Sequence, residues 1–399
     1  MSSPALARPR PVHRAADLLA AYLPGSFYYS SGRGSLLADG VHSTVGAGHG
    51  SRARAAAEAL DAAVVAGIAD PVVAGAIGFR PDSESSLVVP AVVRRAAAPN
   101  AAAATLPASG GAIWSITARP EPDGYAEGVR RALALIDDGE LSKVVLARCL
   151  ELVADSPVSV PSLLARLVRA DPAAHAFAVD VSAPGDSAPR TLVGASPELL
   201  VARRGTEVTA NPLAGSLPRV ADDAENQRRI AALLVSAKDR AEHAHVSAQV
   251  AEVLGRFCVD LDAPAEPAVI GTPTMWHLST RITGRLADPA DPGSSSLGLA
   301  EALHPTPAVC GVPVSRARAV ISELEPEDRG YYSGLVGWTG PDGDGEWVVT
   351  IRSAEVCDRT VRLFAGAGIV AGSDPAAELA ETSAKFRTLL RALGLEGAA

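Results

Sequence analysis

Apolar residues recur at helical or strand spacing along most of the chain after residue 122. In residues 125–138 they fall on one stripe of a predicted helix, formed by Val129, Ala132, Leu133 and Ile136. The run KVVLARCLELV that follows is rich in Val and Leu, which is typical of a buried strand. Further elements are predicted as strands at 143–153, 176–181, 191–193 and 199–203, and as a long helix at 221–254.

The last third of the chain alternates between strands and shorter helices. A final helix is predicted to begin at Asp374 and Pro375, because Asp is a good N-cap and Pro fits the first helical turn. Many strands with helices gathered between groups of them predict an α+β fold with large, mostly antiparallel sheets. The remaining elements are predicted as strands at 277–286, 334–339, 346–357 and 360–365, and as helices at 297–303 and 315–324.

The first third of the chain is rich in alanine, and a loop is expected at 96–109. Residues 62–79 are apolar, but Asp70 and Pro71 interrupt them, and a membrane span needs about 18–20 apolar residues. The amino terminus carries Arg and Pro where a signal peptide needs an uninterrupted apolar run. We therefore expect a soluble cytoplasmic protein with no membrane partner.

Composition narrows the class of protein further. The 399 residues are 48% hydrophobic, which excludes a wholly disordered chain. A net charge of −9 argues against nucleic acid as a partner, so any anionic ligand must meet a locally basic site. The four cysteines are far apart in sequence and form no CxxC pair, so we expect free thiols in a reducing compartment.

One carboxylate falls on the inward face of a predicted helix. Glu242 precedes Val246 by four residues and therefore lies on the side of the apolar stripe of residues 238–254. Such a carboxylate is costly to bury unless it is paired with an arginine or bound to a cation, and both alternatives stay open. His243 and His245 diverge around the helix and HExxH is absent, so the sequence does not support a metalloprotease site.

Further charged residues have both a structural and a chemical interpretation. Glu378, Glu381 and Lys385 follow one line of the final helix, either as surface pairs or as part of a site beside the glycines of FAGAGI at 364–369. Lys143 starts an apolar strand face, where a lysine either reaches the rim or acts as a base in a pocket. Arg352 either pairs structurally or grips a carboxylate through two hydrogen bonds.

Taken together, nine blocks resemble the chorismate-utilising enzymes and occur in that family's order over about residues 125–392. The amino-terminal third is similar only loosely, as in FYYSS at 27–31. The blocks are KVVLAR at 143–148, GASPELL at 194–200, PLAGS at 212–216, KDRAEH at 238–243, HPTPA at 304–308, LEP at 324–326 ahead of RGYYSG at 329–334, WVVTIR at 347–352, FAGAGI at 364–369, and Glu381-Thr382 with Lys385.

The resemblance implies a fold of large, mostly antiparallel sheets in two intertwined subdomains with helices packed outside. It implies a variable amino-terminal portion of that fold at 1–124 and a chorismate-binding catalytic region at 125–395. Within the family the chain is most similar to isochorismate synthases, because Lys143, PLAGS and the segment around His277 match them. Salicylate synthases, which also eliminate pyruvate, are the alternative, and a non-catalytic binding module would be expected to lack one of the charged groups. Aminating members usually lack the lysine, so no glutamine amidotransferase subunit is expected.

The resemblance also implies roles for individual residues. Lys143 would deprotonate a water that attacks C2 of chorismate, and Glu198 would protonate the hydroxyl that leaves C4. Glu242 and Glu381 would hold Mg²⁺, and Glu378 would orient the waters of the ion. The product would enter siderophore, menaquinone or salicylate synthesis, between which the sequence does not choose. Residues expected to bind the substrate or shape its pocket are Gly215, His277, Ala308, Val309 (where the family has leucine), Arg352, Gly366 and Lys385.

Overall fold

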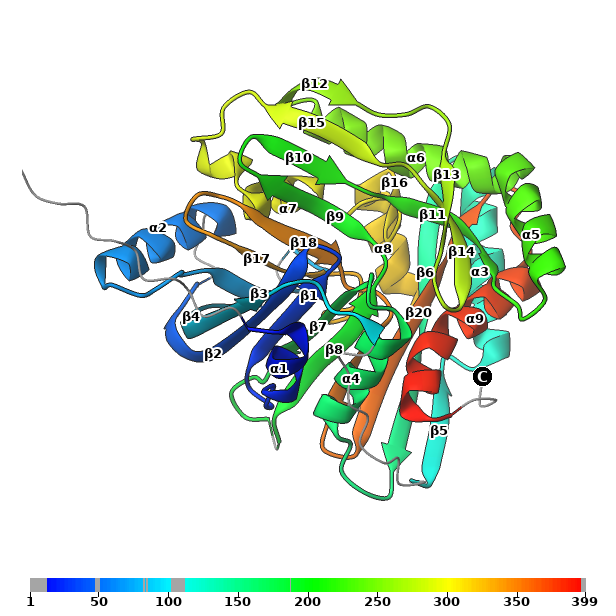
Figure 1. Ribbon diagram of the computed structural model, residues 1–399. Coiled ribbons are helices and arrows are strands. Elements are labelled where there is room, and N and C mark those ends of the chain that lie inside the picture. The colour runs from blue at the N-terminus through cyan, green and yellow to red at the C-terminus, as the bar shows by residue number, and fades with distance from the viewer. Residues whose placement is uncertain are drawn as a thin grey trace, which may run out of the picture.

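The computed structural model describes residues 13–46, 51–81, 83, 85–101, 112–186 and 188–395 of the chain (Figure 1). Most of the loop predicted at 96–109 lies outside these ranges. The helices are α1 (Ala15–Ala20), α2 (Arg52–Val65), α3 (Pro122–Asp137), α4 (Val160–Ala170), α5 (Asp223–Val235), α6 (Ala237–Leu254), α7 (Ser296–Leu303), α8 (Val314–Leu324) and α9 (Pro375–Leu393). Within the same ranges, no helix combines the length and apolar character needed to cross a membrane.

The strands of the first half of the chain are β1 (Phe27–Ser31), β2 (Gly34–Thr44), β3 (Val73–Ile77), β4 (Ser85–Ala96), β5 (Trp114–Arg119), β6 (Lys143–Ala154), β7 (His175–Asp180), β8 (Arg190–Ser196) and β9 (Leu199–Arg204). Those of the second half are β10 (Glu207–Ala210), β11 (Leu213–Pro218), β12 (Cys258–Asp262), β13 (Ala268–Gly271), β14 (Met275–Ser279), β15 (Ile282–Leu286), β16 (Gly311–Val312), β17 (Leu335–Thr339), β18 (Gly345–Val349), β19 (Ser353–Cys357) and β20 (Thr360–Val370).

Most of these strands form one continuous antiparallel ladder, which confirms the predicted sheet type. The ladder runs β5-β6-β20-β19-β8-β7-β1-β2-β4-β3-β17-β18-β9-β10-β15-β12. The amino-terminal strands β1 to β4 therefore stand in the middle of the ladder and join its two ends. A smaller sheet consists of β11, β14 and β13, and helices lie around the outside of the strands (Figure 1).

Three predicted elements are each two elements in the structure. The helix predicted at 221–254 breaks at Ser236, whose backbone is extended and whose side chain accepts from the Asp239 N–H to cap α6. The strand predicted at 277–286 is split between β14 and β15, which belong to different sheets. The strand predicted at 346–357 is interrupted between β18 and β19, where Arg352 has a left-handed φ of 52°, outside the extended range of strand backbone.

Other predictions from the sequence are confirmed. The final helix begins after Asp374, whose side chain accepts from the Ala377 N–H. The pair β6 and β20 is in register from Val153 opposite Thr360 to Lys143 opposite Val370, so β20 extends five residues beyond the predicted strand. The four cysteines are free thiols.

One buried arginine ties together three segments around the start of β6. Arg329 donates to the carbonyls of Val309 at 2.7 Å and Val145 at 2.8 Å, and to the Glu325 carboxylate at 2.8 Å. Glu325 in turn accepts from the Ala147 N–H at 2.7 Å. Because both charges are buried and fully bonded, removal of either one leaves the other without compensation.

We expect Arg329→Met to destabilise the protein by about 3–5 kcal/mol, because it leaves the buried Glu325 carboxylate without its counter-ion and removes a donor from two carbonyls. The matched control is Arg316→Met, which removes a partly exposed ion pair with Glu140 and should cost at most about 1 kcal/mol. Chemical denaturation of both variants measures the difference. Equal losses of stability would show that Arg329 does not tie the segments together.

Candidate active site

One buried pocket collects most of the residues singled out by the sequence. We call it the central pocket. Besides the predicted residues, Ser216, Tyr332 and Gly368 line it. They stand inside the PLAGS, RGYYSG and FAGAGI blocks, so the blocks themselves carried a signal for them. The predicted residues that line it are Glu198, Gly215, Glu242, His277, Ala308, Val309, Arg352, Gly366, Glu381 and Lys385.

Lys143 lies behind the wall of the central pocket and is fully buried. Its Nζ is 3.1 Å from Glu242 Oε1, across the gap between the first residue of β6 and the inner face of α6. A Cβ at Gly368 would lie 2.1 Å from the same Glu242 oxygen and 3.1 Å from Lys143 Cε. The absence of a side chain at 368 therefore allows this lysine and carboxylate to meet against β20.

A second lysine and carboxylate meet on α9. Lys385 Nζ is 2.6 Å from Glu381 Oε1 and also donates to the Gly366 carbonyl at 2.8 Å. Ser216 donates to the same Glu381 oxygen at 3.0 Å. Burial opposes ionisation of Glu381, but the adjacent Lys385 outweighs it, and the pKa of this carboxyl lies below its ordinary value.

Glu378 lies one helical turn before Glu381 and is 1% exposed. Its Oε1 accepts from Lys238 Nζ at 2.7 Å, while its Oε2 has no hydrogen-bond partner among the described residues. Burial, and then the charge of Glu381, raise the pKa of Glu378. The sequence contains three lysines, and each of them contacts a different carboxylate of this region.

The donor set around the central pocket suits a hard divalent cation. Glu242 and Glu381 present carboxylate oxygens from two helices, and Glu378 has a buried oxygen without a partner. No group of three or more His, Cys, Asp or Glu side chains in the described ranges is close enough to hold a metal by itself. Mg²⁺ takes one or two carboxylates and completes its shell with waters and substrate, so Glu242 and Glu381 fit the ligands of such an ion.

Glu198 is a buried acid in the turn between β8 and β9. It is 3% exposed, and burial raises its pKa to about 7, against the opposing effects of the Leu213 N–H and of the cations Lys143, Lys385 and Arg352. A carboxyl group with this pKa holds its proton at neutral pH about half of the time. It can therefore deliver a proton to a leaving group that an ordinary glutamate could not serve.

Arg352 is a buried cation without an acidic partner within 4 Å in the described part of the chain. Its Nη2 lies 3.4 Å from His277 Nε2. Burial, followed by the charge of Arg352, holds the pKa of His277 well below its ordinary value, so this histidine is neutral. The guanidinium is consequently free to bind a carboxylate through two hydrogen bonds.

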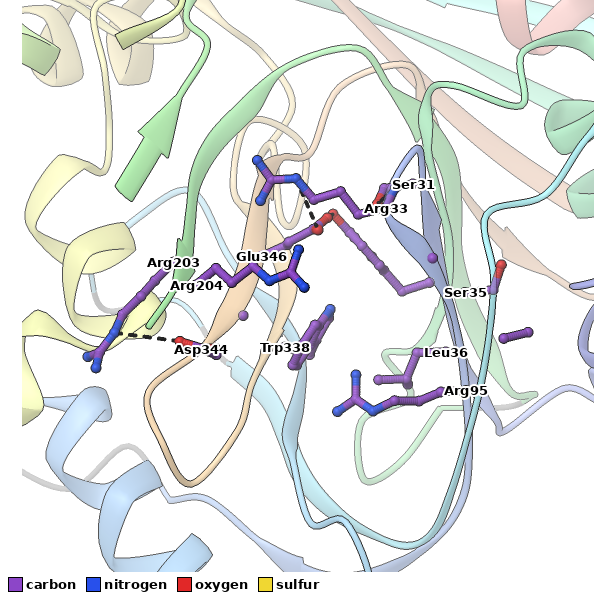
Figure 2. Close-up of a pocket in the computed structure, with 14 residues that line it drawn as sticks. Ser31, Arg33, Ser35, Leu36, Arg95, Arg203, Arg204, Trp338, Asp344 and Glu346 are labelled. Atoms are coloured by element: carbon purple, nitrogen blue, oxygen red, sulfur yellow. Dashed lines mark hydrogen bonds and ion pairs between the residues drawn. The ribbon is translucent and has the colours of Figure 1, made fainter. Parts of the chain in front are cut away.

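Another cavity, of about 270 Å³, contains none of the predicted site residues (Figure 2). Three of its charged groups have protein partners. The Arg95 guanidinium lies 4.4 Å from the centre of the Trp338 ring, and Arg203 donates to four backbone carbonyls. Glu346 accepts from the Tyr29 hydroxyl at 3.1 Å. We therefore assign the predicted chemistry to the central pocket.

Comparisons with known proteins agree on one enzyme family. A family model described as chorismate binding enzyme matches residues 79–394. The isochorismate synthase DhbC of Bacillus subtilis is 48% identical over 389 residues, which cover 96% of this chain and 97% of that protein. The crystal structure of a putative 2,3-dihydroxybenzoate-specific isochorismate synthase from Bacillus anthracis covers 96% of this chain and 100% of its own, with a TM-score of 0.90 and 42% identity.

A more distant structure supports the fold alone. Anthranilate synthase component I from Streptococcus pneumoniae has a TM-score of 0.68 at 20% identity, over 92% of this chain and 91% of its own. This structure shows that a protein with a different name and low sequence identity shares the sheet arrangement.

The raised pKa of Glu198 predicts how stability depends on pH. Its ordinary pKa is 4.5, so folding favours the protonated form, and the stabilisation is full below about pH 4.5 and lost as the pH rises through about 7. Glu198→Gln cannot ionise, so we expect it to gain up to about 3 kcal/mol over wild type between pH 4.5 and pH 8. Urea unfolding at both pH values measures this gain. If the difference in stability between the variant and wild type were the same at both pH values, the pKa of Glu198 would not be raised in the folded protein.

Proposed function

The chain belongs to the chorismate-binding enzyme family, and on this premise we propose that it is an isochorismate synthase, an isomerase that converts chorismate to isochorismate. The observation that carries the proposal is the central pocket, which combines a buried acid of pKa about 7, two carboxylates and Arg352, a cation with no acidic partner within 4 Å among the described residues. The similarity to isochorismate synthases over nearly the full length supports it. A salicylate synthase finds no support in these comparisons.

The reaction adds a hydroxyl group at C2 of the ring and removes the one at C4, without oxidation or reduction. A C–O bond forms at C2 with an oxygen from water, the two ring double bonds shift, and the C4–O bond breaks. Lys143 in its neutral form takes a proton from the attacking water, and Glu198 gives a proton to the hydroxyl that leaves C4. One water is consumed and one is released, so chorismate and isochorismate have the same composition.

The substrate carries two carboxylates, and the proposal assigns a partner to each. Arg352 binds one through its guanidinium, which lacks an acidic partner among the described residues, and Lys385 adds a second positive charge. Gly215, Ala308, Val309 and Gly366 shape the pocket around the ring. Exclusion of water by these buried walls strengthens each charge interaction inside the pocket.

Glu242 and Glu381 are the residues that would hold Mg²⁺, with Glu378 beside them. When bound, the ion would draw electron density from the ring through the ring carboxylate and so favour attack at C2. The Lys143 and Lys385 amines lie next to these carboxylates, at 3.1 Å and 2.6 Å. Each of the two carboxylates therefore also has a lysine partner within the protein. A cytoplasmic location also belongs to the proposal, since the four thiols are free.

Incubation with chorismate should yield isochorismate when Mg²⁺ is present and no product after chelation with EDTA. NMR of the product mixture distinguishes isochorismate from salicylate and pyruvate. Solvent labelled with ¹⁸O should place the label in the product hydroxyl, because the oxygen at C2 comes from water. Salicylate with pyruvate, or unlabelled isochorismate, would contradict the proposed reaction.

Lys143→Ala should lower kcat by about 10²–10⁴-fold, because the variant loses its general base. Mg²⁺ should still raise its Tm, since Glu242 and Glu381 are retained. Lys238→Ala serves as the matched control, because it removes the lysine of this region that contacts Glu378 and not Glu242. If Lys143→Ala turned over chorismate at the wild-type rate, Lys143 would not be the general base and would have a structural role alone.

A further inference from the structure

A second cavity adjoins the central pocket. It has a volume of about 350 Å³ and lies between the last turns of α4 and α9 and the segment 272–274. Pro197 and Arg352 line both this cavity and the central pocket. We call it the antechamber.

The walls of the antechamber pass from exposed to buried residues. Ala170, Pro273 and Arg391 are exposed and stand at its outer end. Ala195 and Arg352 are 6% and 7% exposed and stand where it meets the central pocket. The cavity therefore extends from solvent to the guanidinium that is free to bind a carboxylate.

Cationic groups line the antechamber although the whole chain carries a net charge of −9. Arg391 and Arg166 have no acidic partner within 4 Å in the part of the chain that the structure describes, and Arg166 donates to the Ala392 carbonyl at 3.0 Å. Asp171 is the acid in the wall. Burial raises its pKa, and its Oδ1 accepts from two backbone N–H groups. The cations thus outnumber the acid along this wall.

We propose that the substrate enters the central pocket through the antechamber, and that Arg391 and Arg166 attract its two carboxylates to the outer end. The inference rests on the proposed function, because it needs a dianionic substrate. A cavity lined by positive charge and low-dielectric walls concentrates anions and raises their rate of association. Arg352, at the inner wall, then receives a carboxylate from the antechamber and holds it in the central pocket.

The test places a charge at the outer end without touching the proposed catalytic residues. Ala170→Glu adds a negative charge at the antechamber, and Ala170→Gln adds the same bulk without charge. The matched controls are Ala62→Glu and Ala62→Gln at an exposed alanine of α2, which lies at the far side of the molecule (Figure 1). Steady-state kinetics with chorismate and Mg²⁺ are measured at low salt and at about 1 M NaCl, where charges are screened within about 3 Å.

At low salt we expect kcat/KM of Ala170→Glu to be about fourfold below that of Ala170→Gln, the effect of one charge on a dianion at about 10 Å in water. The ratio should approach one at high salt, kcat should stay within about twofold, and the Ala62 pair should show no difference. Arg391→Gln should lower kcat/KM in the same salt-dependent way, whereas Arg54→Gln on α2 should not.

Equal kcat/KM for the two Ala170 variants at low salt would overturn the proposed route. The substrate would then enter beside Glu381 and Lys385, whose side chains retain 17% and 15% exposure. A wild-type enzyme that does not convert chorismate would instead refute the proposed function. The two failures are therefore distinguished by the wild-type activity alone.

Discussion

The central pocket depends on one constraint: charges buried away from water need charges of opposite sign close by. Glu242, Glu378 and Glu381 each have a lysine within 3.1 Å, although the partners come from different segments of the chain. Removing one partner from such a pair leaves the other uncompensated and costly. The pairs therefore constrain the relative positions of β6, α6 and α9. Arg352 lines the central pocket without an acidic partner within 4 Å among the described residues, which marks it as a group that awaits a charged ligand.

The ladder of strands explains how the chain can hold these segments together. The two ends of the ladder are joined through β1 to β4, so the amino-terminal portion completes the sheet that carries the site without lining the central pocket. A segment that pairs within the sheet but does not line the pocket can keep its fold while its sequence varies. The division between 1–124 and 125–395 is a prediction about sequence constraint, and the strand pairing makes it physically reasonable.

The sequence predicted the elements whose pattern is local and missed the breaks that tertiary structure imposes. The strand β6 and the start of α9 followed from apolar runs and from an Asp-Pro cap. Breaks at Ser236 and before Arg352 could not be predicted, because hydrophobic alternation carries no information about a cap that serves two helices or a left-handed φ. For the site, spacing left Lys143 and Glu242 ambiguous, since their contact joins a strand to a distant helix. The family resemblance brought them together, and it left Ser216, Tyr332 and Gly368 unnamed although their blocks were recognised.

The placement of the lysines has a practical consequence for the chemistry of the chain. The side-chain amines of the sequence are those of Lys143, Lys238 and Lys385. A reagent or modifying enzyme that acylates lysine therefore finds no other lysine in the sequence to react with. Lys238 is the most accessible of the three, with 31% of its side chain exposed, whereas the Lys143 side chain is fully buried. Acylation would thus reach Lys238 first and leave Glu378 as a buried carboxylate without its counter-ion. Coupling through a lysine side chain would therefore attach the protein next to the central pocket.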